Sequence, residues 1–271
     1  ETIGLPPAMV HVVSEQDTDV SPFDLGSYAS RQTYVTGMAV RKAAEEIKKK
    51  VLDYAWGMTD IPASALDIRD AWIVWRHNGE RITPVAEVAL DSCYNTLFAA
   101  PISADVTNNA RANALAYGCT FTEVEVDLPT GKVDVLEIYN IHDAGRLINP
   151  KLAEAQVHGG MSMGIGYALY EQMLFDPKTG KPLNNNLLDY KLMTVLDTPD
   201  LGTAFVETFE PTGPYGNKAL GEPPAISPAP AIRNAIFDAT GVRCYDLPMS
   251  PERLYELFSA AGLGEGGASH V

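Results

Sequence analysis

The pattern of hydrophobic and polar positions predicts helices along much of the chain. Over residues 38–54, apolar residues recur every three or four positions, while Glu–Lys pairs four residues apart occupy the other face. A short helix is expected from Val85, and a longer one from Pro150, whose fixed φ suits a first helical turn. Two more helices are expected over 229–241 and after Ser250, whose hydroxyl suits an N-cap.

Shorter periods predict strands between these helices. Apolar runs flank Asn78-Gly79, a pair typical of a two-residue hairpin turn. Residues 120–141 alternate in polarity around a turn at 129–131, which predicts a second hairpin with one solvated face. A strand is expected near 202–209, and residues 1–13 resemble the tail of a helix, a turn and a strand. Because strands and helices interleave without strict βαβ alternation, the predicted fold class is α+β, or mixed α/β.

Composition indicates a globular protein and limits its partners. A chain of 271 residues with 46% hydrophobic residues can bury a substantial core. The net charge of −15 repels nucleic-acid phosphates and anionic lipids, so neither nucleic acid nor a membrane is an expected partner. No apolar run approaches the ~20 residues that cross a bilayer, and no secretory signal is present, so a cytoplasmic location is expected.

The cysteines and histidines predict no metal site in this chain. Cys93, Cys119 and Cys244 are far apart and form no C-x-x-C pair, which excludes a disulfide framework or a zinc or iron–sulfur site. They are expected to be buried apolar residues. His142 and His158 share no metal-ligand spacing and are interpreted as hydrogen-bonded structural histidines.

The first candidate site is the loop of residues 24–37, DLGSYASRQTYVTG. Hydroxyl and amide groups, among them Ser27, Ser30 and Gln32, crowd this loop just before a predicted helix. Such groups and the positive end of the helix dipole can hold a phosphate or a polar heterocycle. The alternative is an ordinary Ser/Thr-rich helix entry, and no P-loop pattern is present.

The second candidate site lies in residues 142–166. Gln156 sits one helical turn before Gly160, and its amide could match the polar edge of a planar ring. Glycines at 159, 160, 164 and 166 each cost about 1 kcal/mol in a helix, so they imply close approach of another backbone or a ligand. The alternatives are a tightly packed helix or a phosphate loop. The glycines follow a helix start, which is the wrong context for a dinucleotide fingerprint.

The third candidate site is GPYGNKALGEPP, residues 213–224. Glu222 stands between Gly221, which permits close approach, and Pro223, which should restrict Glu222 to extended geometry. Burial in such a loop would raise the proton affinity of the carboxylate, as a general base requires. The alternative is an ordinary loop residue.

The three segments together resemble the C-terminal part of the molybdenum-binding (large) subunit of the xanthine dehydrogenase and aldehyde oxidoreductase family of molybdenum hydroxylases. The resemblance covers nearly the whole chain, through INPKLAEAQVHGGMSMGIGYALYE, GPYGNKALGEPP and ATGVRCYDLPMSPERL. Each motif is moderately specific alone, and their shared order and spacing make the combination strong. The resemblance implies two intimate subdomains that hold molybdenum through molybdopterin, as the cytosine dinucleotide, without a protein ligand to the metal.

The resemblance also implies roles for individual residues. Glu222 would be the catalytic base for hydroxylation with oxygen derived from water. Gln156 would bond the pterin edge, and Gly221 would lie close to the cofactor. The remaining implied contacts, to the pterin or its phosphates, come from the first loop: Ser27, Ala29, Ser30, Arg31 and Gln32.

Partners follow from the same resemblance: the N-terminal half of the molybdenum subunit, an iron–sulfur subunit with [2Fe–2S] clusters, an FAD subunit and a small-molecule substrate. The chain starts at Glu1, so a preceding segment is expected, and these residues alone should not turn over. Residues 1–110 and 111–262 are expected to be the first and second parts of a molybdopterin-binding domain, with a flexible tail at 263–271.

The expected activity is hydroxylation of a purine, another N-heteroaromatic compound or an aldehyde. One alternative is a hydroxybenzoyl-thioester reductase of the same family, and another is a non-catalytic structural or assembly module that keeps the fold. Pterin binding discriminates the last of these from an enzyme.

Overall fold

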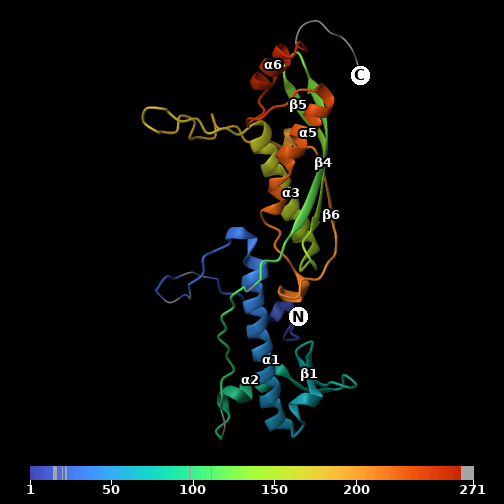
Figure 1. The fold of residues 1–271 in the computed structure, drawn as a ribbon. Helices are drawn as coiled ribbons and strands as arrows, with labels where there is room; N and C mark the ends of the chain where they lie inside the picture. The colour runs from blue at the N-terminus through green and yellow to red at the C-terminus, as the bar shows by residue number, and fades with distance from the viewer. Residues whose placement is uncertain (15–16, 20, 22, 98, 111, 264–271) are drawn as a thin grey trace. The chain divides into compact units, whose positions relative to one another are not determined.

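The computed structural model describes residues 1–14, 17–19, 21, 23–97, 99–110 and 112–263 (Figure 1). The chain forms two compact units, Glu1–Ala112 and Asn113–Val271. Apart from Leu263, the tail expected at 263–271 lies outside the described residues. That residues 1–110 and 111–262 are the two parts of one molybdopterin-binding domain stays a prediction.

The first unit packs two helices against a three-stranded antiparallel sheet of order β1-β2-β3. Its core gathers apolar residues from α1, the sheet and α2: Val51, Leu52, Ala55, Leu66, Ile68, Ile73 and Val88. The elements are η1 (Pro7–Met9), η2 (Tyr28–Ser30), the π-helical turn η3 (Gln32–Thr36), α1 (Gly37–Thr59), η4 (Ala63–Ala65), β1 (Leu66–Arg69), β2 (Trp72–Trp75), β3 (Arg81–Pro84) and α2 (Val85–Tyr94).

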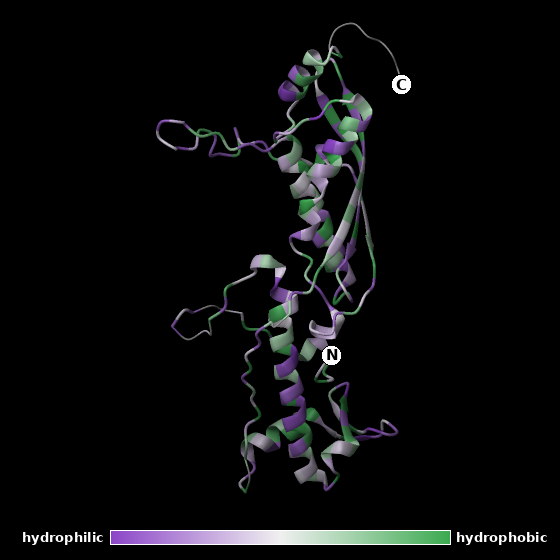
Figure 2. Ribbon diagram, in the orientation of Figure 1, coloured by the Kyte–Doolittle hydropathy of each residue, from purple (hydrophilic) through white to green (hydrophobic). Residues whose placement is uncertain are grey.

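Local signals in this unit are confirmed by the structure. The amphipathic pattern of residues 38–54 lies within α1, whose middle is strongly hydrophilic where it carries its charged face (Figure 2). Helix α1 ends at Thr59, and its C-cap Asp60 adopts a left-handed conformation with φ 58°. Strands β2 and β3 form the hairpin predicted around Asn78-Gly79, with Gly79 at φ 76°. Helix α2 begins at Val85, as predicted.

The second unit has a mixed sheet of order β4-β5-β6, in which β4 and β5 are antiparallel and β6 runs parallel to β5. Helices α3 and α5 cover one face of this sheet (Figure 1). The elements are β4 (Tyr117–Asp127), β5 (Lys132–Asp143), α3 (Pro150–Leu169), η5 (Val195–Asp197), β6 (Asp200–Phe205), η6 (Pro214–Gly216), α4 (Pro223–Ile226), α5 (Pro228–Thr240) and α6 (Pro251–Ala260). The predicted mixture of helices and sheets with antiparallel hairpins is confirmed.

The core of the second unit explains this packing. Ile138 of β5, Met161 and Ile165 of α3, Ile232 of α5 and Phe258 of α6 are all fully buried. Val124 and Val126 of β4 pack against this core while the glutamates between and beside them are exposed, as the alternation predicted. Burying side chains of this size contributes about 1.5–3 kcal/mol each, which ties the helices to the sheet.

Two glycines of α3 let other backbones approach the helix, as their positions predicted. A Cβ built on Gly160 would lie 2.5 Å from Pro224 Cβ, and one on Gly164 would lie 2.7 Å from Pro228 Cβ. Pro224 belongs to the turn α4, and Pro228 is the first residue of helix α5. Helix α3 can therefore pack against both elements at short range, and Gly160 also lines the site described below.

The strand expected near 202–209 is present as β6, although it ends at Phe205, close to where its partner β5 ends at Asp143. Two other expectations are wrong. Residues 1–13 contain neither helix nor strand beyond the turn η1, because the apolar residues after it are exposed and no strand pairs with them in this unit. Cys93 and Cys119 are exposed, and only Cys244 is buried.

In the part of the chain that the structure describes, every helix is too short or too polar to span a bilayer.

Candidate functional site

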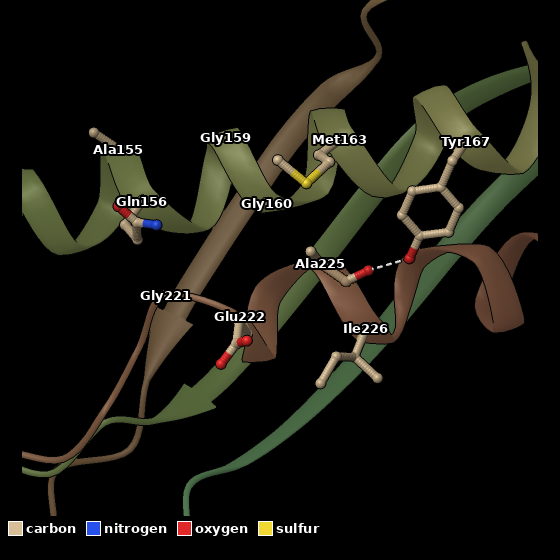
Figure 3. A pocket seen from close by; sticks show the side chains of 10 residues that line it. All are labelled: Ala155, Gln156, Gly159, Gly160, Met163, Tyr167, Gly221, Glu222, Ala225 and Ile226. Carbon is tan, nitrogen blue, oxygen red and sulfur yellow. Dashed lines mark hydrogen bonds between the residues drawn. The ribbon is translucent and has the colours of Figure 1, made fainter. Parts of the chain in front are cut away.

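A cavity of about 740 Å³ lies between α3 and the segment that leads into α4 (Figure 3). Gln156, Gly221 and Glu222 all line it, so the structure brings three of the predicted site residues together. The other lining residues are Ala155, Gly159, Gly160, Met163, Tyr167, Ala225 and Ile226. A volume of several hundred Å³ lined by apolar groups and a few polar ones is typical of a small-molecule site.

Helix α3 presents one face to this cavity. Its start is fixed by Asn149, whose side chain accepts a hydrogen bond from Leu152 N, and by Pro150 in the first turn. From Gln156, positions three, four, seven and eleven residues further along the helix line the cavity: Gly159, Gly160, Met163 and Tyr167. A Cβ on Gly159 would meet nothing within 4 Å, so this glycine leaves open space beside the Gln156 amide.

The backbone of Glu222 differs from the prediction. Glu222 is the N-cap of the turn α4, and its φ of −79° and ψ of −37° are right-handed helical rather than extended. Ala225 N donates to Glu222 O at 2.9 Å, and this hydrogen bond closes the turn. The steric preference that a following proline imposes is overcome because Pro223 and Pro224 occupy the first helical positions, where proline fits well.

The burial expected for Glu222 is also wrong, because its side chain is exposed at the edge of the cavity. Exposure keeps the carboxylate hydrated in this chain. The carboxylate and the Gln156 amide nevertheless come from different elements and border the same cavity (Figure 3). A ligand in the cavity could meet both groups.

Buried polar contacts hold the turn after Glu222 in place. The Tyr167 hydroxyl donates to Ala225 O across the cavity wall (Figure 3). Asn140, which is completely buried in β5, donates from Nδ2 to Pro224 O at 3.2 Å. The hydroxyls of Thr120 and Ser227 lie 2.5 Å apart.

The predicted loop residues Ser27, Ala29, Ser30, Arg31 and Gln32 all belong to the first unit, whereas the cavity belongs to the second. Ala29 and Ser30 have φ of 51° and 55°, a left-handed conformation that is uncommon for residues other than glycine. The Arg31 guanidinium lies 3.0 Å from the Asp24 carboxylate and also donates to Gly26 O.

The helix after this loop starts earlier than predicted. Gln32–Thr36 form a π-helical turn that continues into α1, and Thr36 Oγ1 donates to Gln32 Oε1. Ser27 is the N-cap of the short turn η2, which precedes it. The loop therefore has an irregular backbone directly before a long helical segment.

His142 is buried, as expected of a structural histidine, but the expected hydrogen bonds of its ring are missing within the described ranges of the chain. It is 1% exposed, and neither ring nitrogen has a hydrogen-bond partner among the described residues; the same holds for His158 Nε2. Burial lowers the pKa of His142 and so favours the neutral ring. Gly118 accommodates that ring, since a Cβ there would lie 2.5 Å from it.

Among the described residues, no three His, Cys, Asp or Glu side chains are grouped so that they could hold a metal ion. The residues do fit an organic cofactor that carries its own metal. Gly159 leaves space that a side chain would fill, and Gln156 lies beside that space with donor and acceptor atoms suited to a heterocycle.

Comparison with known proteins identifies the family of the chain. A family model described as the molybdopterin cofactor-binding domain matches residues 1–199. The chain is 47% identical over 264 residues to a putative xanthine dehydrogenase molybdenum-binding subunit of Escherichia coli K12, covering 97% of this chain and 35% of that protein. It is 30% identical over 259 residues to the carbon monoxide dehydrogenase large chain of Hydrogenophaga pseudoflava, covering 94% and 32%.

A solved structure agrees as well. Quinoline 2-oxidoreductase from Pseudomonas putida 86 superposes with a TM-score of 0.85 at 26% identity, covering 95% of this chain and 34% of that one. The chain belongs to the family of molybdopterin cofactor-binding domains. Within it, the chain is the molybdopterin-binding portion of a molybdenum subunit of the xanthine dehydrogenase and carbon monoxide dehydrogenase type. The resemblance to a molybdenum-binding subunit of the xanthine dehydrogenase family is confirmed. The chain spans about a third of the length of these relatives.

Proposed function

We propose that the cavity between α3 and α4 receives the molybdenum–molybdopterin cofactor and that Glu222 is the base for water-derived hydroxylation of the substrate. The observation that carries the proposal is the convergence of Gln156 and Glu222 on one cavity in a chain of this family. A polar amide at one side and a carboxylate at the other give separate places for a heterocyclic cofactor and a reacting carbon.

Different residues of the chain would contact different parts of the cofactor. Gln156 would bond the pterin edge, while Gly159 and Gly221 would admit the ring without a side chain in its way. The first loop would contact the pterin or its phosphates through Ser27, Ala29, Ser30, Arg31 and Gln32. The Arg31 guanidinium already binds the Asp24 carboxylate, and a phosphate would compete for the same donors.

When bound, the cofactor supplies the two-electron oxidation of the substrate carbon. A Glu222 carboxylate oxygen would accept the proton released when an oxygen atom from water is transferred to that carbon. The turn α4, which begins directly after Glu222, fixes the backbone on one side of this carboxylate. Because the side chain is exposed in this chain, we propose that the rest of the molybdenum subunit covers it in the complex.

The proposed substrates are purines first, then other N-heteroaromatic compounds and aldehydes. The 47% identity to a xanthine dehydrogenase subunit supports this order. The proposed partners are the remaining half of the molybdenum subunit, an iron–sulfur subunit and an FAD subunit. The carbon monoxide dehydrogenase relative is itself named a large chain, which supports an assembly of several subunits. We also propose the cytosine dinucleotide form of the cofactor.

The decisive experiment is analysis of the complex purified from its native host with this chain as bait. Metal mass spectrometry and fluorescence of the oxidised cofactor measure molybdenum and pterin directly. Their presence, with co-purifying iron–sulfur and flavin chains and turnover of xanthine or hypoxanthine, is the expected result. An intact complex that lacks both molybdenum and pterin would reject the proposed function and favour a structural module.

Gln156→Ala is expected to lower the pterin content of the complex several-fold, because it removes the amide that faces the open space beside Gly159. Loss of hydrogen bonds of this kind weakens binding by about 1–3 kcal/mol. The matched control is Glu154→Ala, an exposed residue of the same helix that does not line the cavity. Equal pterin content in both variants would argue against a contact with Gln156.

A further inference from the structure

Strand β5 holds both ends of the segment that carries Glu222. Before Glu222, Lys218 Nζ lies 2.8 Å from Asp143 Oδ2, and the side chains of this pair are only 11% and 14% exposed. After Glu222, the buried Asn140 donates to Pro224 O. Glu222 therefore lies between two attachments to residues three positions apart on one strand.

The attachment at Lys218 involves several bonds at once. Asp143 Oδ1 accepts hydrogen bonds from Thr208 Oγ1 at 2.6 Å and from Gly145 N at 3.0 Å, so both oxygens of this carboxylate are engaged. Lys218 N also donates to Ala144 O at 2.8 Å. Backbone and side chain of Lys218 thus hold the same end of the strand.

Adjacent backbone contacts extend this attachment. Gly145 and Asn217 form an antiparallel bridge, and Arg146 N donates to Gly216 O at 2.9 Å. A Cβ on Gly145 would lie 2.2 Å from that same Gly216 oxygen, so the two strands of backbone are in close contact. The chain is consequently fixed up to Lys218, and only the short stretch to Glu222 remains between the two attachments.

We propose that Lys218 is a positioning residue, whose ammonium, held by Asp143, sets where the Glu222 carboxylate lies in the cavity. This inference rests on the proposed function, in which Glu222 is the base. A displacement of about 1 Å of a catalytic group can cost about 100-fold in rate. A slight shift of the Lys218–Asp143 ion pair would therefore be enough to lower the rate. A buried charge that loses its partner draws in water or moves, and either response would release the segment.

The test uses Lys218→Met in the assembled complex, because Met keeps the length of the side chain and removes the ammonium. We expect faster amide hydrogen exchange across residues 217–226 and a 10- to 100-fold lower kcat, on the order of a small misplacement. The KM for xanthine and the molybdenum and pterin contents should not change. The control is Lys132→Met, which breaks the ion pair between Lys132 and Asp134. This pair has the same N–O distance of 2.8 Å, but its side chains are 62% and 48% exposed.

Two further variants keep the inference falsifiable. Lys218→Arg retains the positive charge and should restore kcat to within a few-fold of the native complex. If Lys218→Met does not assemble, Asp143→Asn takes its place, since it keeps the size of the side chain and weakens the same ion pair.

Unchanged hydrogen exchange in residues 217–226, or a fall in molybdenum that parallels the fall in kcat, would overturn the positioning role. The exchange measurement does not depend on turnover. Failure of this inference is therefore distinguishable from failure of the proposed function, which would show as normal turnover by a complex with Glu222→Gln.

Discussion

A complex that carries Glu222→Gln is expected to retain its molybdenum and pterin and to lose most of its hydroxylation activity. Gln has the shape of Glu and can still accept hydrogen bonds through its amide oxygen, but it cannot accept the proton of the water-derived oxygen. General base catalysis contributes about 100- to 10,000-fold in rate, so kcat should fall by a factor in this range. Steady-state kinetics with xanthine, together with metal and pterin analysis of the same preparation, measure both quantities.

The control is Glu207→Gln, which changes an exposed carboxylate of the same unit that does not line the cavity. Turnover close to normal in Glu222→Gln would exclude Glu222 as the catalytic base. A parallel loss of pterin and kcat would instead assign Glu222 to cofactor binding. Only loss of kcat at constant cofactor content supports proton transfer at this position.

Elements whose boundaries depend on one or two residues could be predicted from the sequence. The hairpin at Asn78-Gly79 depends on backbone that tolerates positive φ, and Pro150 pre-sets the first turn of α3. Ser250 is the N-cap of α6, as predicted, and its hydroxyl accepts a hydrogen bond from Arg253 N. These signals act within a few residues, so they do not depend on the rest of the fold.

Predictions that depended on a distant partner were less successful. Val10, Val12 and Val13 suit a strand, yet they are exposed in the first unit because no neighbouring strand pairs with them there. The geometry of Glu222 was inferred from Pro223 alone, whereas both Pro223 and Pro224 start a helical turn packed on Gly160. A local preference of this kind is easily overridden by tertiary packing.

Part of the lining of the cavity could be predicted from the sequence, whereas the roles of its residues stay predictions. The resemblance indicated Gln156 and Glu222, and the structure places both on one cavity. Met163 and Tyr167 could have been found as well, since they share the helical face of Gln156. The contact of Lys218 with Asp143 could not have been found, because it joins residues 75 positions apart. Neither of the candidate segments, 142–166 and 213–224, contains both residues.

The adjacent glycines of α3 should respond in opposite ways to a single methyl group. In Gly160→Ala the new Cβ would lie 2.5 Å from Pro224 Cβ and 3.0 Å from Pro224 C, so α4 would have to move. Overpacking costs about 1–3 kcal/mol, against a gain of about 1 kcal/mol in helix propensity. In Gly159→Ala the Cβ meets nothing within 4 Å, and the propensity gain remains. Thermal unfolding followed by circular dichroism should therefore rank Gly159→Ala above Gly160→Ala.

The same two variants distinguish an effect on stability from an effect on cofactor binding. Gly159→Ala should lower the pterin content of the complex although it does not destabilise the fold, because its methyl group occupies the open space beside Gln156. Gly160→Ala should lower kcat through movement of α4, which begins directly after Glu222. Equal melting temperatures would contradict the close packing of α3 on α4. Full pterin content in Gly159→Ala would show that the space beside this glycine is not where the cofactor binds, and would move the proposed site away from this face of α3.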